Sequence, residues 1–114
     1  MRRQLGQLRP ANTNAASVFT PTETKEYRIY SIHIANVGTE ASNASIYHDA
    51  NGSTYNQTTA IMYGTAVPVG GTVIIELPLG IGDYQVAGNI GVQSSVASTL
   101  NFTIYGEILG EVLG

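Results

Sequence analysis

The clearest feature of the chain is an alternation of apolar and polar residues with a period of two, near its C-terminal end. Leu100, Phe102 and Ile104 alternate with polar residues at 101, 103 and 105. Successive side chains of a β-strand point to opposite faces, so this spacing is typical of a strand with one buried face. We expect the three apolar side chains to lie in the core.

A second alternating segment covers residues 28–36. Tyr30, Ile32 and Ile34 are predicted to share one face, and the residues between them to share the other. The segment ends where Asn36 is followed by Val-Gly-Thr, which interrupts the pattern. It is therefore predicted to be a strand in which Tyr30 lies on the same face as Ile32 and Ile34.

Shorter apolar segments of the same kind are separated by Gly, Pro and Asn. Asn51-Gly52 is a signal for a hairpin turn, Gly70-Gly71 marks a further turn, and Pro68 indicates an edge strand or a strand end. About seven or eight short strands and no amphipathic helix predict an all-β, antiparallel β-sandwich or jelly-roll-like domain. A small closed barrel is the alternative. The shorter segments lie at residues 45–48, 60–63, 72–77, 83–87 and 90–93.

Three parts of the chain are distinguished by this pattern. Residues 1–20 sustain no period and are predicted to form an extended arm, which contacts either its own domain or a neighbouring subunit. Residues 21–108 are predicted to form the sandwich, and residues 109–114 an apolar tail. Apolar residues of the arm and tail, with one tyrosine opposite the core face of the last strand, are the expected interface: Leu5, Leu8, Val18, Phe19, Tyr105, Val112 and Leu113.

The composition indicates a surface whose polar groups are mostly uncharged. The 114 residues suit one domain, and without cysteine the chain has no disulfide or thiol chemistry. Charged residues make up 11% of the chain, against about 25% in an average domain. Neutral polar groups cost less to desolvate than charges, so this surface favours packing against neighbours, although a hydroxyl-rich surface is also common in β proteins.

The charge balance and apolar runs exclude some partners. The net charge is −3, and Arg2, Arg3 and Arg9 leave the remainder of the chain more acidic than that total. An acidic body repels nucleic acid and anionic lipid, and three arginines are too few to indicate a nucleic-acid site. We find no apolar run of the length that a secretion signal or a membrane span requires.

No catalytic, metal-binding or cofactor motif is found in the sequence. His33 and His48 each lie in a predicted strand, and Asp49 follows His48 so that the two point to opposite faces. We therefore predict no enzyme activity, no metal, no cofactor and no small-molecule substrate. The alternative of another class is a carbohydrate-binding module, because exposed tyrosines can stack on sugars and the chain has seven of them. The absence of tryptophan argues against that alternative.

A set of short motifs spread over most of the chain resembles small β-structured virion proteins of tailed bacteriophages. The motifs are Gln7-Leu8-Arg9-Pro10, Val18-Phe19-Thr20-Pro21, Ile34-Ala35-Asn36, Gly52-Ser53-Thr54-Tyr55, Ala60-Ile61-Met62-Tyr63 and Phe102-Thr103-Ile104-Tyr105-Gly106-Glu107-Ile108.

Within that class the chain looks most like a capsid decoration, or cement, protein. The resemblance implies a non-enzymatic subunit made in the bacterial cytoplasm and carried on the capsid exterior. It also implies a homo-oligomer, with a trimer favoured, that contacts the major capsid protein or other virion subunits through its arm. A neck, tail or fibre-attachment subunit is the structural alternative, and no residue of a defined family contact can be matched here.

Overall fold

The computed structural model describes residues 3–19, 25–49, 53–83 and 89–111, and the fold they form is all-β. These residues contain eight strands and no helix, as the alternating pattern predicts. The strands are β1 (Arg3–Leu8), β2 (Ala16–Phe19), β3 (Lys25–Asn36), β4 (Ser42–Asp49), β5 (Ala60–Val67), β6 (Thr72–Asp83), β7 (Asn89–Ser94) and β8 (Leu100–Glu111).

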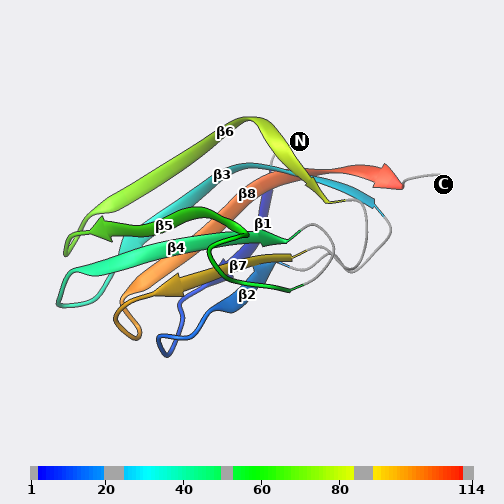
Figure 1. The fold of residues 1–114 in the computed structure, drawn as a ribbon. Helices are drawn as coiled ribbons and strands as arrows, with labels where there is room; N and C mark the ends of the chain where they lie inside the picture. Colours follow the sequence, from blue (N-terminus) through cyan, green and yellow to red (C-terminus); the bar gives the residue numbers. More distant parts are fainter. Residues whose placement is uncertain (1–2, 20–24, 50–52, 84–88, 112–114) are drawn as a thin grey trace.

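Two four-stranded antiparallel sheets pack face to face (Figure 1). Sheet A has the order β1-β8-β3-β6 and sheet B the order β2-β7-β4-β5. The chain is thus a long hairpin, in which the first strand pairs with the last, the second with the seventh, the third with the sixth and the fourth with the fifth. Wrapping this hairpin over two sheets gives jelly-roll topology. The sandwich prediction is confirmed, and the closed barrel is not formed.

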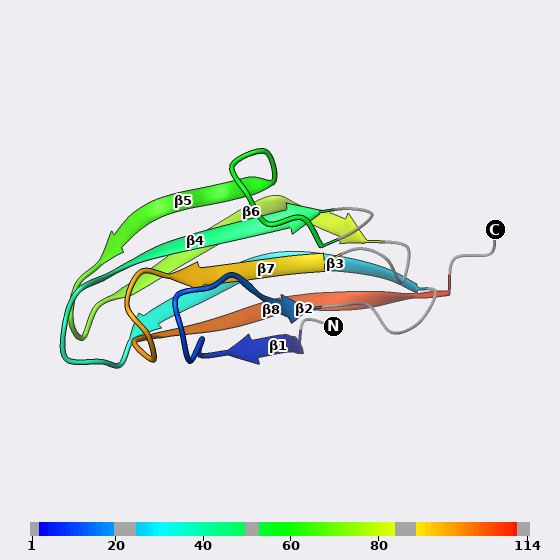
Figure 2. The ribbon, with the colours of Figure 1, turned by 60° about the horizontal axis from the view of Figure 1, so that its bottom comes forward.

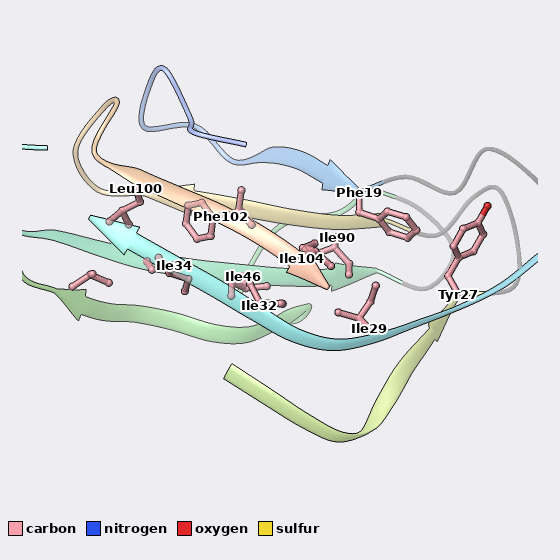
Figure 3. Close-up of a cluster of buried hydrophobic side chains, with 13 residues drawn as sticks. Phe19, Tyr27, Ile29, Ile32, Ile34, Ile46, Ile90, Leu100, Phe102 and Ile104 are labelled. Atoms are coloured by element: carbon pink, nitrogen blue, oxygen red, sulfur yellow. The ribbon is translucent and has the colours of Figure 1, made fainter. Parts of the chain in front are cut away.

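The core lies between the two sheets and consists mainly of β-branched and aromatic side chains (Figure 3). Residues of β8 predicted to face inward are fully buried there, as are their counterparts in the middle of β3. Val73, Ile75 and Leu77 of β6 pack on the margin of this core, while Ile74 between them is 53% exposed. The buried core side chains are Phe19, Tyr27, Ile29, Ile32, Ile34, Ala44, Ile46, Val67, Ile90, Val92, Leu100, Phe102 and Ile104.

A β-bulge in β3 changes which residues face the core. The register of β3 against both neighbouring strands shifts between Ile29 and Ser31. An extra residue in a strand reverses the faces beyond it, so Ile29 is buried and Tyr30 is only partly covered. The prediction that Tyr30 lies on the same face as Ile32 is therefore wrong, because strict alternation does not hold across the bulge.

The N-terminal segment lies on its own domain, the first of the two positions predicted for the arm, and it does so as two strands of the sandwich. β1 pairs with β8 at the edge of sheet A, and β2 pairs with β7 at the edge of sheet B (Figure 2). The predicted boundaries at residues 20 and 109 are also not those of the fold, since two strands precede the first and β8 continues to Glu111. Pairing satisfies the backbone polar groups of these segments, which a free arm would leave to water.

The turn between β5 and β6 agrees with its sequence signals. Gly71 N donates to Pro68 O at 2.9 Å, and Gly70 has φ +71°, a left-handed conformation that favours glycine in a type II turn. Pro68 follows the end of edge strand β5, as predicted. The predicted turn at 51–52 lies outside the described residues, as does most of the predicted strand at 83–87.

One end of the sandwich, which we call the loop end, is joined by hydrogen bonds between its connections. It comprises the loops at 9–15, 37–41, 68–71 and 95–99 (Figure 2). Val37 N donates to Thr99 O at 2.8 Å, and Ser98 N donates to Pro10 O at 2.8 Å. These bonds hold three connections in fixed positions relative to one another.

Asn36, 4% exposed, is the centre of that end. Its Nδ2 donates to Glu40 O and Val67 O, both at 3.0 Å, and its Oδ1 accepts from Gly38 N at 2.9 Å. Its backbone N–H donates to Gly71 O at 3.0 Å. A single buried amide therefore joins the ends of β3 and β5 to the loop between β3 and β4.

Candidate interaction surfaces

Three of the residues predicted to form an interface are brought together at the margin between the two sheets. Leu5 of β1 and Val18 and Phe19 of β2 line a hollow of about 370 Å³, together with Tyr27 and Ile108. Phe19 is 7% exposed and packs edge-to-face on Tyr27, with ring centroids 5.2 Å apart. The expectation that Phe19 contacts a partner is corrected, because its ring is used within the core.

The other predicted interface residues have different positions. Leu8 and Leu5 are partly buried and pack against the core. Tyr105 lies on the outer face of sheet A, as predicted. A contact between Tyr105 and a partner subunit stays a prediction. Val112 and Leu113 lie outside the described residues.

The outer face of sheet A carries side chains in rows across its four strands, and we call it the sheet A face. One row is Gln7, Thr103, His33 and Ile74, in the order β1-β8-β3-β6. The next row is Gln4, Tyr105, Ser31 and Glu76, and a third contains Asn101, Ala35 and Thr72.

Two of these rows are linked by an aromatic contact. The rings of His33 and Tyr105 meet edge-to-face with centroids 4.9 Å apart. Glu76 is the one charged residue in the three rows, and it stands on the edge strand β6. This face therefore combines aromatic, amide and hydroxyl groups with the exposed side chain of Ile74 on its edge strand.

Beyond these rows, the β3 bulge turns Tyr30 outward, next to the charged residue Glu107 of β8. The Tyr30 hydroxyl donates to Glu107 Oε1 at 2.6 Å. This hydrogen bond is the main cause that holds the pKa of the Glu107 carboxyl below its ordinary value and raises the pKa of the Tyr30 hydroxyl. Glu107 is therefore ionised across the neutral range and well below it.

The outer face of sheet B carries a cluster of three tyrosines from different segments. Tyr47 of β4 points away from the core yet is 2% exposed, because Tyr55 stacks on it with ring centroids 6.1 Å apart. Tyr63 of β5 meets Tyr47 edge-to-face at 6.5 Å and is itself 59% exposed. A buried ring thus supports an exposed one.

The loop that brings Tyr55 onto this face is fixed at several points. The Tyr55 hydroxyl donates to Asn89 Oδ1 at 3.0 Å, and Thr54 N donates to Asp49 Oδ2 at 2.9 Å. The Tyr55 ring lies directly on Gly91, where an added Cβ would be 2.6 Å from ring atoms. Glycine at this position is what allows the ring to lie flat against β7.

Two adjoining hollows open beside the tyrosine cluster, and we call them together the sheet B groove. One, of about 470 Å³, lies between the tyrosines and residues 56–58. The other, of about 380 Å³, extends towards Asn43, Ser45 and Ser95. Tyr63 and Gln93 line both. Sequence analysis noted the tyrosines but missed the groove, since its parts come from β4, β5, β7 and three loops.

The loop end presents two exposed valines on adjoining connections. Val37 is 50% exposed and Val69 is 54% exposed. The backbone of each connection is held by the bonds of Asn36 and its neighbours. These apolar tips are therefore presented on ordered loops.

The described part of the chain contains no group of three or more His, Cys, Asp or Glu residues placed to hold a metal ion. Within the same residues, no helix has the length and apolar character needed to cross a membrane. Comparison with models of known protein families and with curated proteins finds no match to this chain.

Proposed function

We propose that this protein is a non-enzymatic structural subunit of a tailed-phage virion, which decorates and stabilises the capsid as a homo-oligomer. A trimer is the favoured assembly, and the partner is the major capsid protein or another subunit of the shell. The observation that carries the proposal is the mostly uncharged sheet A face, with His33 and Tyr105 on its central strands and the exposed Ile74 on the edge strand β6.

The chemistry of this face supports contact between protein subunits. The centres of protein interfaces are depleted in charge and enriched in aromatic side chains, and the rows on sheet A have both properties. Removing amide and hydroxyl groups from water costs little when a partner replaces their hydrogen bonds. Glu76 is the one charged residue in these rows, and it lies on the edge strand β6.

The size of this face is also suitable. Sheet A has three strands of twelve residues and one of six. At about 3.3 Å per residue and about 4.8 Å of width per strand, its outer face covers roughly 650 Å² as a flat area. This approaches the roughly 800 Å² that each partner contributes to a standard interface.

The loop end supports a second contact, towards the shell. Val37 and Val69 are apolar, exposed and held on hydrogen-bonded connections. Ordered loops lose little conformational entropy on docking, which favours binding by a small area. Repetition on a symmetric shell would then add avidity to each weak contact. The segment expected from the sequence to be an arm contains β1, which is an edge strand of sheet A.

A neck, tail or fibre-attachment subunit would use the same kind of face, and its stoichiometry would differ. The test is the mass of the full-length protein by light scattering over a concentration series. A trimer that co-sediments with capsids assembled from the capsid protein of the same genome supports decoration. A hexameric or dodecameric ring moves the proposal to the neck or tail. A monomer that does not bind capsids overturns both.

A matched pair of variants tests which face is used. Ile74→Asp replaces an exposed apolar side chain beside His33 on the sheet A face by a charge, and should convert the oligomer to monomers with an unchanged circular dichroism spectrum. Ile61→Asp makes the same change at a residue that is 43% exposed on β5 of sheet B. It should leave the mass unchanged, and equal effects of the two variants would contradict the assignment to sheet A.

A further inference from the structure

We propose that the sheet B groove binds a neutral oligosaccharide, with Tyr63 as the stacking platform and the Gln93 amide as the central hydrogen-bonding group. This inference does not rest on the capsid assignment. The groove lies on the outer face of sheet B, whereas the proposed assembly face belongs to sheet A.

The lining of the groove indicates an uncharged ligand rich in hydroxyl groups. The described residues that line the two hollows are tyrosine, asparagine, glutamine, threonine, serine and glycine, and none of them is charged. A phosphate, a nucleotide or an acidic sugar would lose its hydration without gaining an ionic partner. A sugar ring offers C–H groups to an aromatic face and hydroxyls to amides, which are the two kinds of group present.

The Gln93 amide is held in one orientation at the point where the hollows meet. Its Oε1 accepts from the Tyr47 hydroxyl at 2.6 Å, and its Nε2 donates to Thr13 O at 2.9 Å. An amide has two N–H donors and two acceptor lone pairs, so one donor and one lone pair remain for a ligand. A fixed group that both donates and accepts suits a pair of neighbouring sugar hydroxyls.

The tyrosine cluster provides a preorganised aromatic surface beside that amide. Tyr63 is 59% exposed, and its edge-to-face contact with buried Tyr47 restricts its ring. Tyr55 closes the same hollow and is positioned by Gly91 and Asn89. Rings fixed before binding need not be ordered by the ligand, which favours affinity at a small site.

The dimensions fit a short chain of sugars rather than a single one. The two hollows have volumes of about 470 and 380 Å³ and share Tyr63 and Gln93. Volumes of this size are typical of small-molecule sites. One ring would stack on Tyr63, and the next would reach the serine and asparagine side chains towards the loop end.

The test is a titration of the ¹⁵N-labelled full-length protein with four neutral hexasaccharides: cellohexaose, maltohexaose, mannohexaose and chitohexaose. At least one should shift the side-chain amide signals of Gln93 with a Kd of about 1 mM or tighter. Tyr63→Ala should weaken that binding about tenfold or more, since an exposed ring can be removed without opening the core. Gly91→Ala should also weaken it by displacing the Tyr55 ring.

Two controls separate this site from the rest of the surface. Tyr105→Ala removes a tyrosine from sheet A and should leave the affinity unchanged. A heparin hexasaccharide should not shift the Gln93 signals. The inference is overturned if none of the four neutral sugars perturbs Gln93, if Tyr63→Ala binds as tightly as the natural protein, or if the acidic sugar alone binds. Loss of oligomerisation in the Ile74→Asp variant with sugar binding retained would confirm that the two proposals are independent.

Discussion

Replacing Asn36 by alanine tests whether one buried amide holds the loop end together. The change removes three side-chain hydrogen bonds, to Glu40 O, Val67 O and Gly38 N. Each bond contributes about 1 kcal/mol net. The carbonyl of Val67, a fully buried residue, is the one that water replaces least easily. We expect Asn36→Ala to lower the free energy of unfolding by about 2–3 kcal/mol.

The assay is urea denaturation at one fixed protein concentration, because an oligomer gains apparent stability with concentration. Circular dichroism and tyrosine fluorescence both report the transition, and the chain has no tryptophan. The midpoint should fall while the slope against urea stays the same, since the buried area hardly changes. In a thermal scan the loss corresponds to a melting temperature lower by about 10 °C.

Asn36→Asp is a second variant that tests the amide donors of Asn36. It replaces the two amide donors by a carboxylate oxygen that faces carbonyl oxygens in a site that is 4% exposed. At neutral pH this variant should be less stable than Asn36→Ala, because a buried charge lacks a partner of opposite sign. Asn43→Ala, at an exposed position of β4, is the matched control and should change stability by less than about 0.5 kcal/mol. Stability of Asn36→Ala equal to that of the control would refute the reasoning.

Three further predictions follow from the described contacts. The double change Leu5→Ser and Leu8→Ser should destabilise the domain by about 2 kcal/mol in the same urea assay, because both side chains pack on the core. Unchanged stability would mean that the contacts of β1 do not stabilise the domain. Gly106→Ala should cost at least about 2 kcal/mol, since its Cβ would overlap a backbone carbonyl of β3, and a folded variant of normal stability would disprove that overlap. Tyr30→Phe should raise the pKa of Glu107, measured by ¹³C NMR of the carboxyl, because the hydroxyl that lowers it is lost. A lowered carboxyl pKa contributes stability at neutral pH that disappears as pH falls through the folded value, so this variant should lose less stability on acidification; an unchanged pKa would contradict the cause.

The sequence predicts best where local alternation and burial agree. In β8 the period of two continues without a break from Leu100 to Ile104, and all three apolar residues are buried as expected. In β3 the same reasoning fails at Tyr30, because a bulge inserts one residue into the period and leaves no local signal of its position.

The pattern fails most clearly for the two N-terminal strands. β1 contains Gly6 and a register shift, and β2 has only four residues, so neither shows a sustained period. Both become strands because β8 and β7 offer pairing edges, and those partners lie far along the chain. Such strands are determined by tertiary context rather than by local propensity. The groove on sheet B was missed for the same reason, since Tyr63 and Gln93 meet only through the strand order.

The pairing of the first strand with the last has a consequence for biosynthesis. In sheet A, β8 lies between β1 and β3. Neither β1 nor β3 can therefore complete its pairing until residues 100–108 have been made. At about 5–20 residues per second, the roughly ninety residues that separate β1 from β8 take about 5–20 seconds to synthesise. Until β8 is made, the edge of the isoleucine-rich β3 that pairs with β8 has no partner on the nascent chain. The domain can therefore complete its fold only after β8 has been synthesised, through contacts distant in sequence. Until then, strands of neighbouring nascent chains can pair with one another.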